Sequence, residues 1–234
     1  MNARIVVWIL VMIFLTSCET SVENDGFYVF SRVYDFSIDS YDWRGDFTEY
    51  PVGDSVAYEL KFDYAEPPSN LGSGKTLILT GNNHSDDLFM FLKKRLTELS
   101  PNTEYSISFE IKFATNVSAG LVGIGGSPGE SVYLKVGANA EEPTKVASDG
   151  FYILNLDKGN QSSRGDDMII IGTVSSNNAY DSNYAIETRN NITSFKARTN
   201  QDGELWIIVG TDSGFEGQTT IYYTRISLVL TRSA

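Results

Sequence analysis

The feature that most constrains the fold is a long segment in which apolar and polar residues alternate one by one. Tyr105, Ile107, Phe109, Ile111 and Phe113 occupy every second position, with Glu, Ser or Lys between them. Successive side chains of a strand point to opposite faces, so this spacing predicts a strand with one face on a core and one in water. An amphipathic helix would need apolar residues at intervals of three and four instead.

The same pattern recurs along the chain and predicts an all-β protein. Alternation is present in residues 58–64, 132–136 and 226–230, and continuous apolar runs at 168–173 and 205–209 are typical of central strands. Short strands separated by turn residues at this spacing predict a jelly-roll β-sandwich of two antiparallel sheets. We expect one such domain over residues 26–234.

The N-terminus predicts export and a lipid anchor. Arg4 precedes an apolar run from Ile5 to Leu15, which is shorter than the ~20 residues that span a bilayer and suits a signal peptide. The following Leu15-Thr16-Ser17-Cys18 resembles the lipobox of bacterial lipoprotein precursors, and Cys18 is the only cysteine. The resemblance implies a signal peptide over residues 1–17, lipid attachment at Cys18 and a polar tether through residue 25. The alternative is a plain signal peptide with an incidental cysteine.

The anchor implies a membrane partner and a location. Each buried CH₂ of an acyl chain contributes ~0.8 kcal/mol, so two or more chains hold a protein on a membrane without a transmembrane helix. Glu19 follows the cysteine, and it is not the Asp associated with inner-membrane retention in some bacteria. We therefore expect a lipid-anchored protein of the bacterial cell envelope, on the outer membrane. The sequence does not distinguish the periplasmic face of that membrane from the surface face.

Charge and motif context exclude several functions. The net charge is −12, and it becomes −13 without residues 1–17, whose only charge is Arg4, so nucleic acid is excluded as a partner. The G-x-S-x-G spacing of the nucleophile elbow of serine hydrolases is present in Gly125-Gly126-Ser127-Pro128-Gly129. Pro128 lacks the backbone N–H that the oxyanion hole needs at this position, which argues against a serine hydrolase. Gly72-Ser73-Gly74-Lys75-Thr76 imitates a phosphate loop, yet a predicted strand follows it where a helix is required, so nucleotide is excluded as well.

Three segments resemble galactose-binding-like jelly rolls, a group that includes many bacterial carbohydrate-binding modules. They are Leu99-Ser100-Pro101-Asn102-Thr103-Glu104-Tyr105, Gly203-Glu204-Leu205-Trp206-Ile207 and Tyr222-Tyr223-Thr224-Arg225-Ile226-Ser227-Leu228. The resemblance favours a strand for residues 88–99, which also fit a helical face. It implies a sugar-binding domain. Thr224 stands where the family often carries an Asp that holds calcium, which puts calcium at that position in doubt.

The candidate ligand site combines aromatic and acidic loop residues, because sugar rings stack on aromatic faces while their hydroxyls bind carboxylates and amides. The residues are Tyr41, Asp42, Trp43, His84, Asp86, Asp212, Phe215 and Glu216. Calcium would suit the oxygens of the 82–87 loop, and a transition metal would suit its imidazole. The alternative interpretation is a set of buried aromatics and solvated turn acids.

The sequence therefore favours non-catalytic binding of an extracellular glycan or a similar polar ligand. No catalytic residue is assigned, and an enzymatic function is the less favoured hypothesis. The alternatives are a structural or protein-interaction subunit of an envelope complex, and a hydrolase that uses carboxylates or a metal. A glycosidase needs two carboxylates placed across a bond, and the sequence gives no reason to select a pair.

Overall fold

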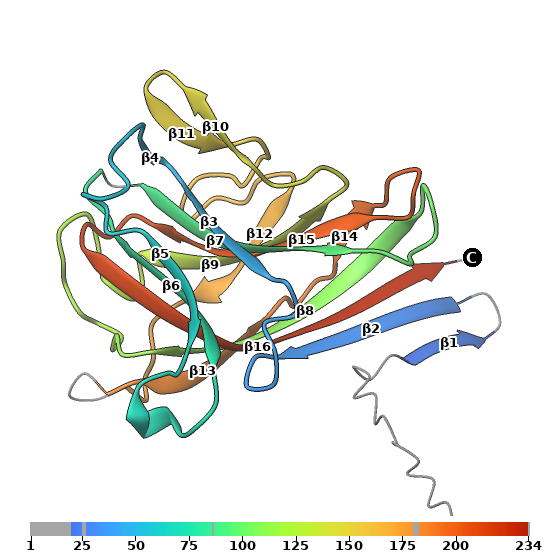
Figure 1. Cartoon of the computed structure of the whole chain (residues 1–234), viewed down its shortest axis with the longest axis horizontal. Coiled ribbons are helices and arrows are strands. Elements are labelled where there is room, and N and C mark those ends of the chain that lie inside the picture. The colour runs from blue at the N-terminus through green and yellow to red at the C-terminus, as the bar shows by residue number, and fades with distance from the viewer. Residues whose placement is uncertain (1–19, 25–26, 86, 180–182, 234) are drawn as a thin grey trace, which may run out of the picture.

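The fold is a sandwich of two antiparallel β-sheets (Figure 1). The computed structural model describes residues 20–24, 27–85, 87–179 and 183–233. One 3₁₀ turn, Ser69–Leu71, is the only helical element in this part of the chain. The expected jelly-roll β-sandwich is confirmed.

The larger sheet is organised by its longest strand. β16 pairs with β8 on one side and, on the other, with β6 along its first half and β2 along its second. β1 and β5 extend the sheet beyond β2 and β6, and β13 and β14 lie end to end along β8. The strands of this sheet are β1 (Thr20–Asn24), β2 (Phe27–Asp35), β5 (Lys61–Ala65), β6 (Thr76–Asn82), β8 (Glu104–Thr115), β13 (Ala185–Asn190), β14 (Phe195–Arg198) and β16 (Gln218–Ser233).

The second sheet has five strands in the order β12-β9-β15-β7-β3. These strands are β3 (Arg44–Thr48), β7 (Leu88–Leu96), β9 (Val132–Asn139), β12 (Met168–Thr173) and β15 (Leu205–Ser213). The ambiguous 88–99 segment thus forms a strand over most of its length, as expected. A small third sheet joins β10 (Lys145–Ser148), β11 (Phe151–Leu154) and β4 (Tyr50–Pro51).

Alternation decides which side chains form the core between the sheets. The odd-numbered apolar residues of β8 from Tyr105 to Phe113 are at most 2% exposed and face inward. In the five-stranded sheet, Leu134 of β9 and Ile207 of β15 face them. A core of this kind supplies most of the stability, because each fully buried aliphatic or aromatic side chain contributes about 1.5–3 kcal/mol.

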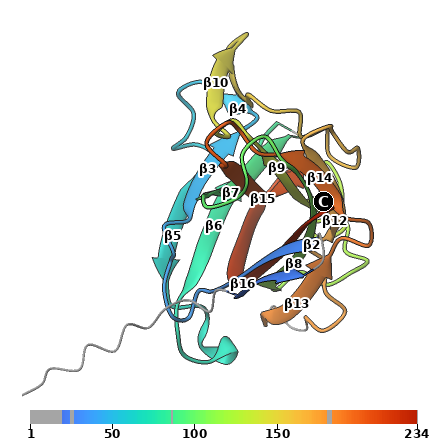
Figure 2. The same cartoon turned by 90° about the vertical axis from the view of Figure 1, so that its right-hand side faces the viewer.

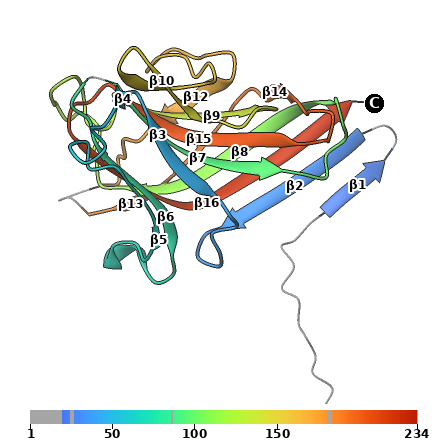
Figure 3. The same ribbon diagram turned by 45° about the horizontal axis from the view of Figure 1, so that its top comes forward.

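The outer face of the five-stranded sheet is also partly buried, which the sequence did not predict. The β10–β11 hairpin and the loop that follows it lie over this face (Figures 1 and 3). Figure 2 shows β10 projecting above the sandwich. We call residues 140–167 the covering segment. A second apolar cluster fills the space beneath this segment, and the cluster consists of Phe89, Phe91, Leu154, Leu156, Met168 and Ile208.

Three local predictions differ from the structure. Tyr58 to Leu60 form a turn before β5, because the amides of Tyr58 and Leu60 bond to carbonyls of Asp54 and Ser55 rather than to a strand. β12, expected as a central strand, lies at the sheet edge, where its isoleucines are half-buried. Residues 20–24, expected within the tether, form β1 and pair with β2.

We expect the covering segment to contribute to stability through the second cluster. Phe91→Ala removes a fully buried ring and should lower the free energy of unfolding by about 3–5 kcal/mol. Phe151→Ala makes the same change on the outer side of the hairpin, where the ring is 42% exposed, and should cost less than about 1 kcal/mol. Equal losses in urea denaturation would contradict this account of the covering segment.

Candidate functional site

An open cleft lies at one end of the outer face of the five-stranded sheet. Its volume is about 570 Å³. Its lining comprises Asp42, Arg44, Lys94, Arg95, Thr97, Glu142 and Trp206. Trp206 is the only aromatic among them, so the cleft combines one indole ring with charged and hydroxyl groups.

The strand register explains why Trp206 reaches this surface. Leu205 and Ile207 of β15 face the core between the sheets, so Trp206 points to the outer face. It lies between Asn139 on β9 and Arg95 on β7, beyond the part of the face that the second cluster fills. The indole is therefore half-buried rather than covered.

The cleft exists because β3 pairs with only part of β7. The first residue of β3, Arg44, pairs with Lys93, and β7 continues to Leu96 without a partner on that side among the described residues. The turn before β3 places Tyr41 and Asp42 in the left-handed backbone region, with φ of 50° and 58°. This turn bends the chain away from β7 and leaves the free edge open.

Ion pairs hold part of the charged lining in place. Lys93 Nζ lies 2.8 Å from Glu142 Oε1, donates to the Pro143 carbonyl at 2.7 Å and sits 5.9 Å from the centroid of the Trp206 ring. Arg95 pairs with Glu204 at 3.3 Å. These contacts hold Glu142 in the cleft lining.

Two lining cations have no carboxylate partner within ion-pair distance among the described residues. Arg44 is exposed, and Lys94 donates to the Tyr41 carbonyl. Burial lowers the pKa of Lys94, although the nearby Asp42 and Asp39 carboxylates act in the opposite direction. The cleft therefore offers positive charge to a ligand.

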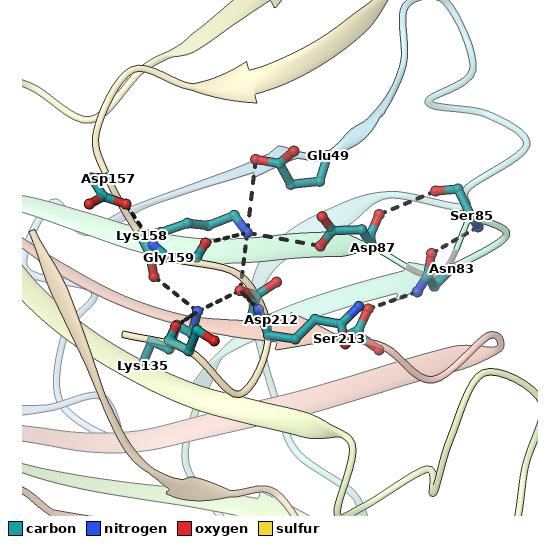
Figure 4. Close-up of polar contacts among 12 residues, drawn as sticks. Glu49, Asn83, Ser85, Asp87, Lys135, Asp157, Lys158, Gly159, Asp212 and Ser213 are labelled. Atoms are coloured by element: carbon teal, nitrogen blue, oxygen red, sulfur yellow. Dashed lines mark hydrogen bonds and ion pairs between the residues drawn. The ribbon is translucent and has the colours of Figure 1, made fainter. Parts of the chain in front are cut away.

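A second polar cluster lies at the opposite end of the same face, and it is buried (Figure 4). Asp212 Oδ2 accepts hydrogen bonds from Lys135 Nζ at 2.7 Å, from Lys158 Nζ at 3.0 Å and from the Gln161 amide at 2.9 Å. The side chains of Asp212 and Lys135 are fully buried. Lys158 comes from the covering segment, so this cluster ties that segment to the sheet.

Three carboxylates surround the Lys158 ammonium. Besides Asp212, Glu49 Oε1 and Asp87 Oδ1 each lie 3.9 Å from Lys158 Nζ (Figure 4). Burial lowers the pKa of Lys158, but the carboxylates outweigh it, and the net pKa lies above the usual lysine value. Lys158 thus carries a full positive charge in a buried setting.

Asp87 is the titratable member of this cluster near neutral pH. Burial, opposed by the Lys158 ammonium and reinforced by the Asp212 and Glu49 carboxylates, raises its pKa to about 7. Burial also raises the pKa of Glu49. One proton on Asp87 leaves two carboxylates against two ammonium groups, which balances the charge of the buried cluster.

The structure divides the predicted site residues between two ends of the sheet. Thr48 of β3 aligns with Phe89 and, through it, with Asp212, whereas Arg44 aligns with Lys93 near the Trp206 end. The turn before Arg44 and the turn after Asp212 are therefore separated by the length of β3. The residues that the sequence predicts as one ligand site therefore lie in two separate places.

At the first end, only part of the predicted set faces the cleft. Asp42 lines it, and Tyr41 is half-buried with its ring edge-on to Tyr34. Trp43 is 3% exposed and packs edge-on against Tyr34 and Phe36. Trp43 is thus a core residue with no ring face free for a ligand.

At the other end, the remaining residues have mixed surroundings. His84 is exposed and lies edge-on to Tyr58, while Asp212 is enclosed by the two lysines. Phe215 packs against the core, and the amide of Glu216 bonds to the Ile124 carbonyl. Asp86 and Cys18 lie outside the described residues.

The sequence contained a signal for the missed tryptophan. Trp206 stands between two core residues, so period-two phase alone assigns it to the opposite face. Lys135 has the same phase between Leu134 and Val136. What the sequence could not show is that the covering segment leaves Trp206 accessible and buries Lys135.

Neither a metal centre nor a membrane-spanning helix is found in the part of the chain that the structure describes. Its His, Asp and Glu side chains nowhere gather in a group of three or more that could hold a metal ion. Thr224, which stands where the resembling family often carries a calcium-binding Asp, donates its hydroxyl to the Lys112 carbonyl beside a bulge in β16. Within those same residues, no helix has the length and apolarity to cross a membrane.

No protein-family model matches the sequence, and no curated protein does. The similar solved structures include TmCBM27, a mannan-recognising carbohydrate-binding module (11% identity, TM-score 0.38, covering 93% of this chain and 99% of the module). Another is TmCBM61 in complex with β-1,4-galactotriose (13% identity, TM-score 0.34, covering 83% and 92%). The chain also matches the tailspike protein 4 enzyme domain of bacteriophage CBA120 over 82% of its own length but spans only 20% of that protein (11% identity, TM-score 0.36).

The chain has a β-sandwich of two antiparallel sheets, as the sequence predicts. TM-scores below 0.5 carry no information about the ligand. The assignment of the fold class rests on the strand pairing itself.

Lys135→Met should destabilise the protein by about 3 kcal/mol, because it removes one partner of a fully buried ion pair and three hydrogen bonds. Lys196→Met is the matched control, since Lys196 pairs with Glu104 at an exposed site and should change stability by less than about 1 kcal/mol. Chemical denaturation of both variants measures this difference. Similar small effects would show that the buried pair is not a stabilising contact.

Asp87 should make stability fall as the pH rises. Its folded-state pKa of about 7 exceeds the unfolded value of about 4. Between these values the native state binds a proton on Asp87 that the unfolded state has released. This proton stabilises the native state, and the stabilisation is lost as the pH rises through 7. Asp87→Asn mimics the protonated form, so its melting temperature relative to the wild type should increase from pH 5 to pH 8. A constant difference across this range would rule out the assigned titration.

Proposed function

We propose that this protein is a lipid-anchored, non-catalytic binding protein of the bacterial cell envelope, and that its cleft beside Trp206 binds an extracellular glycan. The observation that carries the proposal is the half-buried indole of Trp206 in an open cleft of about 570 Å³. An aromatic face packs against the C–H surface of a sugar ring, and surrounding charged groups and hydroxyls bond to the sugar hydroxyls.

The chemistry of the lining supports binding rather than hydrolysis. Glu142 is held by Lys93, whereas the described carboxyl with the most strongly raised pKa, Asp87, belongs to the buried cluster at the other end of the sheet. A glycosidase needs a protonated acid and a second carboxylate on either side of the bond to be cleaved. Of the two carboxyls that line the cleft, Asp42 and Glu142, the second is already engaged by the Lys93 ammonium.

The proposed anchor rests on the N-terminal sequence. Residues 15–18 match the lipobox pattern, and Cys18 has no other cysteine with which to pair. A protein held on the outer membrane in this way would meet polymers outside the cell or in the periplasm. Mass spectrometry of the membrane fraction tests the anchor, because an acylated N-terminal Cys18 has a characteristic mass.

A second function, in protein interaction, is favoured by the outer side of the hairpin. Val146 and Ile153 are direct register partners there, and with Phe151 they are between 37% and 45% exposed. An exposed apolar face is typical of an interaction surface. Crosslinking in native membranes, compared between the wild type and Phe151→Ser, would test it.

Trp206→Ala should abolish glycan binding without unfolding the protein, because the side chain is half-buried at the surface. The measurement is binding of the full chain, in a detergent without sugar groups, to a broad glycan array. A folded Trp206→Ala variant that keeps its affinity would overturn the cleft as the binding site.

Phe215→Ala serves as the comparison at the other end of the sheet. Loss of binding in this variant alone would transfer the site to the loops around His84 and Phe215. Absence of any array signal for the wild type would overturn the glycan proposal and leave protein interaction as the favoured function.

A further inference from the structure

The cleft is part of a longer groove that follows the free edge of β7. A second hollow of about 180 Å³ shares Lys94, Arg95 and Thr97 with the cleft. Its other lining residues are Phe30, Arg32, Tyr34, Leu96 and Glu98. The groove thus runs from the Trp206 face, around the edge of β7, to β2 of the larger sheet.

The groove concentrates positive charge in a chain whose net charge is −12. Its lining cations are Arg32, Arg44, Lys94 and Arg95, and Lys93 lies behind the indole. Carboxylates neutralise some of them: Glu142 pairs with Lys93, Glu204 with Arg95 and Glu98 with Arg32. Arg44 and Lys94, by contrast, have no ion pair among the described residues, although the Asp42 carboxylate also lines the cleft and its charge acts on Lys94.

These two cations occupy opposite sides of the free edge. Arg44 belongs to the outer-face phase of β3, because its register partner Lys93 lies on that face. Lys94 has the inner-face phase, and its ammonium sits 5.6 Å from the Tyr34 ring. A ligand lying on Trp206 and crossing the edge would therefore meet Arg44 first and Lys94 next.

We propose that the groove selects acidic glycans, whose sugar rings carry carboxylate groups, over neutral ones. This inference rests on the proposed glycan binding at Trp206 and adds the ligand class. A sugar carboxylate matches the planar fork of the Arg44 guanidinium, which binds such groups through two parallel hydrogen bonds. The next carboxylate along the polymer reaches the Lys94 ammonium, whose burial disfavours its charge and which a bound anion stabilises.

The geometry disfavours a simple anion site. Small anions need only the charge, whereas this groove places the free guanidinium beside an aromatic ring on the same face of the sheet. An acidic peptide would satisfy the charge and would add to the free edge of β7 as a strand, but it would not need the indole face. Dependence on both Trp206 and Arg44 is thus the property that identifies an acidic sugar.

The test uses paired ligands that differ only in charge. Oligosaccharides of galacturonate, of mannuronate and guluronate, and of glucuronate are each compared with their carboxyl-reduced, neutral forms. The full chain in a sugar-free detergent is titrated with each pair by calorimetry. At least one acidic member should bind tenfold or more tightly than its reduced form, and this preference should shrink as sodium chloride is raised from 50 to 500 mM.

Variants separate charge recognition from sugar recognition. Arg44→Gln should weaken binding of the acidic form about tenfold more than it weakens binding of the reduced form, whereas Trp206→Ala should weaken both forms to a similar degree. Arg164→Gln is the matched control, because Arg164 is exposed and does not line the groove. The control should bind as the wild type does.

The possible failures are distinguishable. Equal affinity for acidic and reduced forms, or an equal effect of Arg44→Gln on both, would overturn the preference for acidic glycans and leave the proposed glycan binding intact. Competition by polyglutamate that persists in Trp206→Ala would overturn it in favour of an acidic peptide. No binding of any oligosaccharide by the folded wild type would overturn both proposals.

Discussion

The architecture of the functional face depends on one buried salt bridge, between Lys135 and Asp212. Both side chains project from the outer face of a sheet, where they would ordinarily meet water, and both are fully buried. A buried charge needs a partner and saturated hydrogen bonds, because its desolvation costs several kcal/mol. The covering segment brings the Lys158 ammonium and the Gln161 amide to Asp212 Oδ2, and two backbone carbonyls to the Lys135 ammonium.

The position of the salt bridge also determines which part of the outer face of the five-stranded sheet the covering segment leaves open. The covering segment closes the sheet above Asp212 and the second apolar cluster, and Trp206 lies six residues before Asp212 on β15, beyond that cover. The two ends of one strand therefore have different roles. One end fastens the covering segment, and the other forms the floor of an accessible cleft.

The alternation of apolar and polar residues predicted most strands, because a strand that buries one face against a core needs an apolar residue at every second position. The expected inward residues of β8 and β9 are all buried, and the strand choice for β7 is correct. The edge position of β12 was not predictable, since a run of isoleucines fits an edge strand that packs against neighbouring loops as well as a central one.

The candidate site was predicted less well, for a different physical reason. Aromatic and acidic residues in turns suggest a ligand site, but the same composition describes a core aromatic such as Trp43 and a paired acid such as Asp212. Distinguishing them requires knowledge of which face a distant segment covers. Only Asp42 of the predicted set lines the cleft, and its tryptophan comes from a strand rather than a loop.

The pairing of β2 with β16 has a mechanical consequence. If the proposed anchor at Cys18 holds the protein, tension on a bound polymer enters the sandwich through β1 and β2. β1 can peel from β2 one residue at a time, but β2 is joined to β16 by a register of nine residue pairs, from Arg225 and Asp35 to Ser233 and Phe27. A pull along the strands loads all nine pairs in shear at once, so this joint would resist forces that open the N-terminal hairpin.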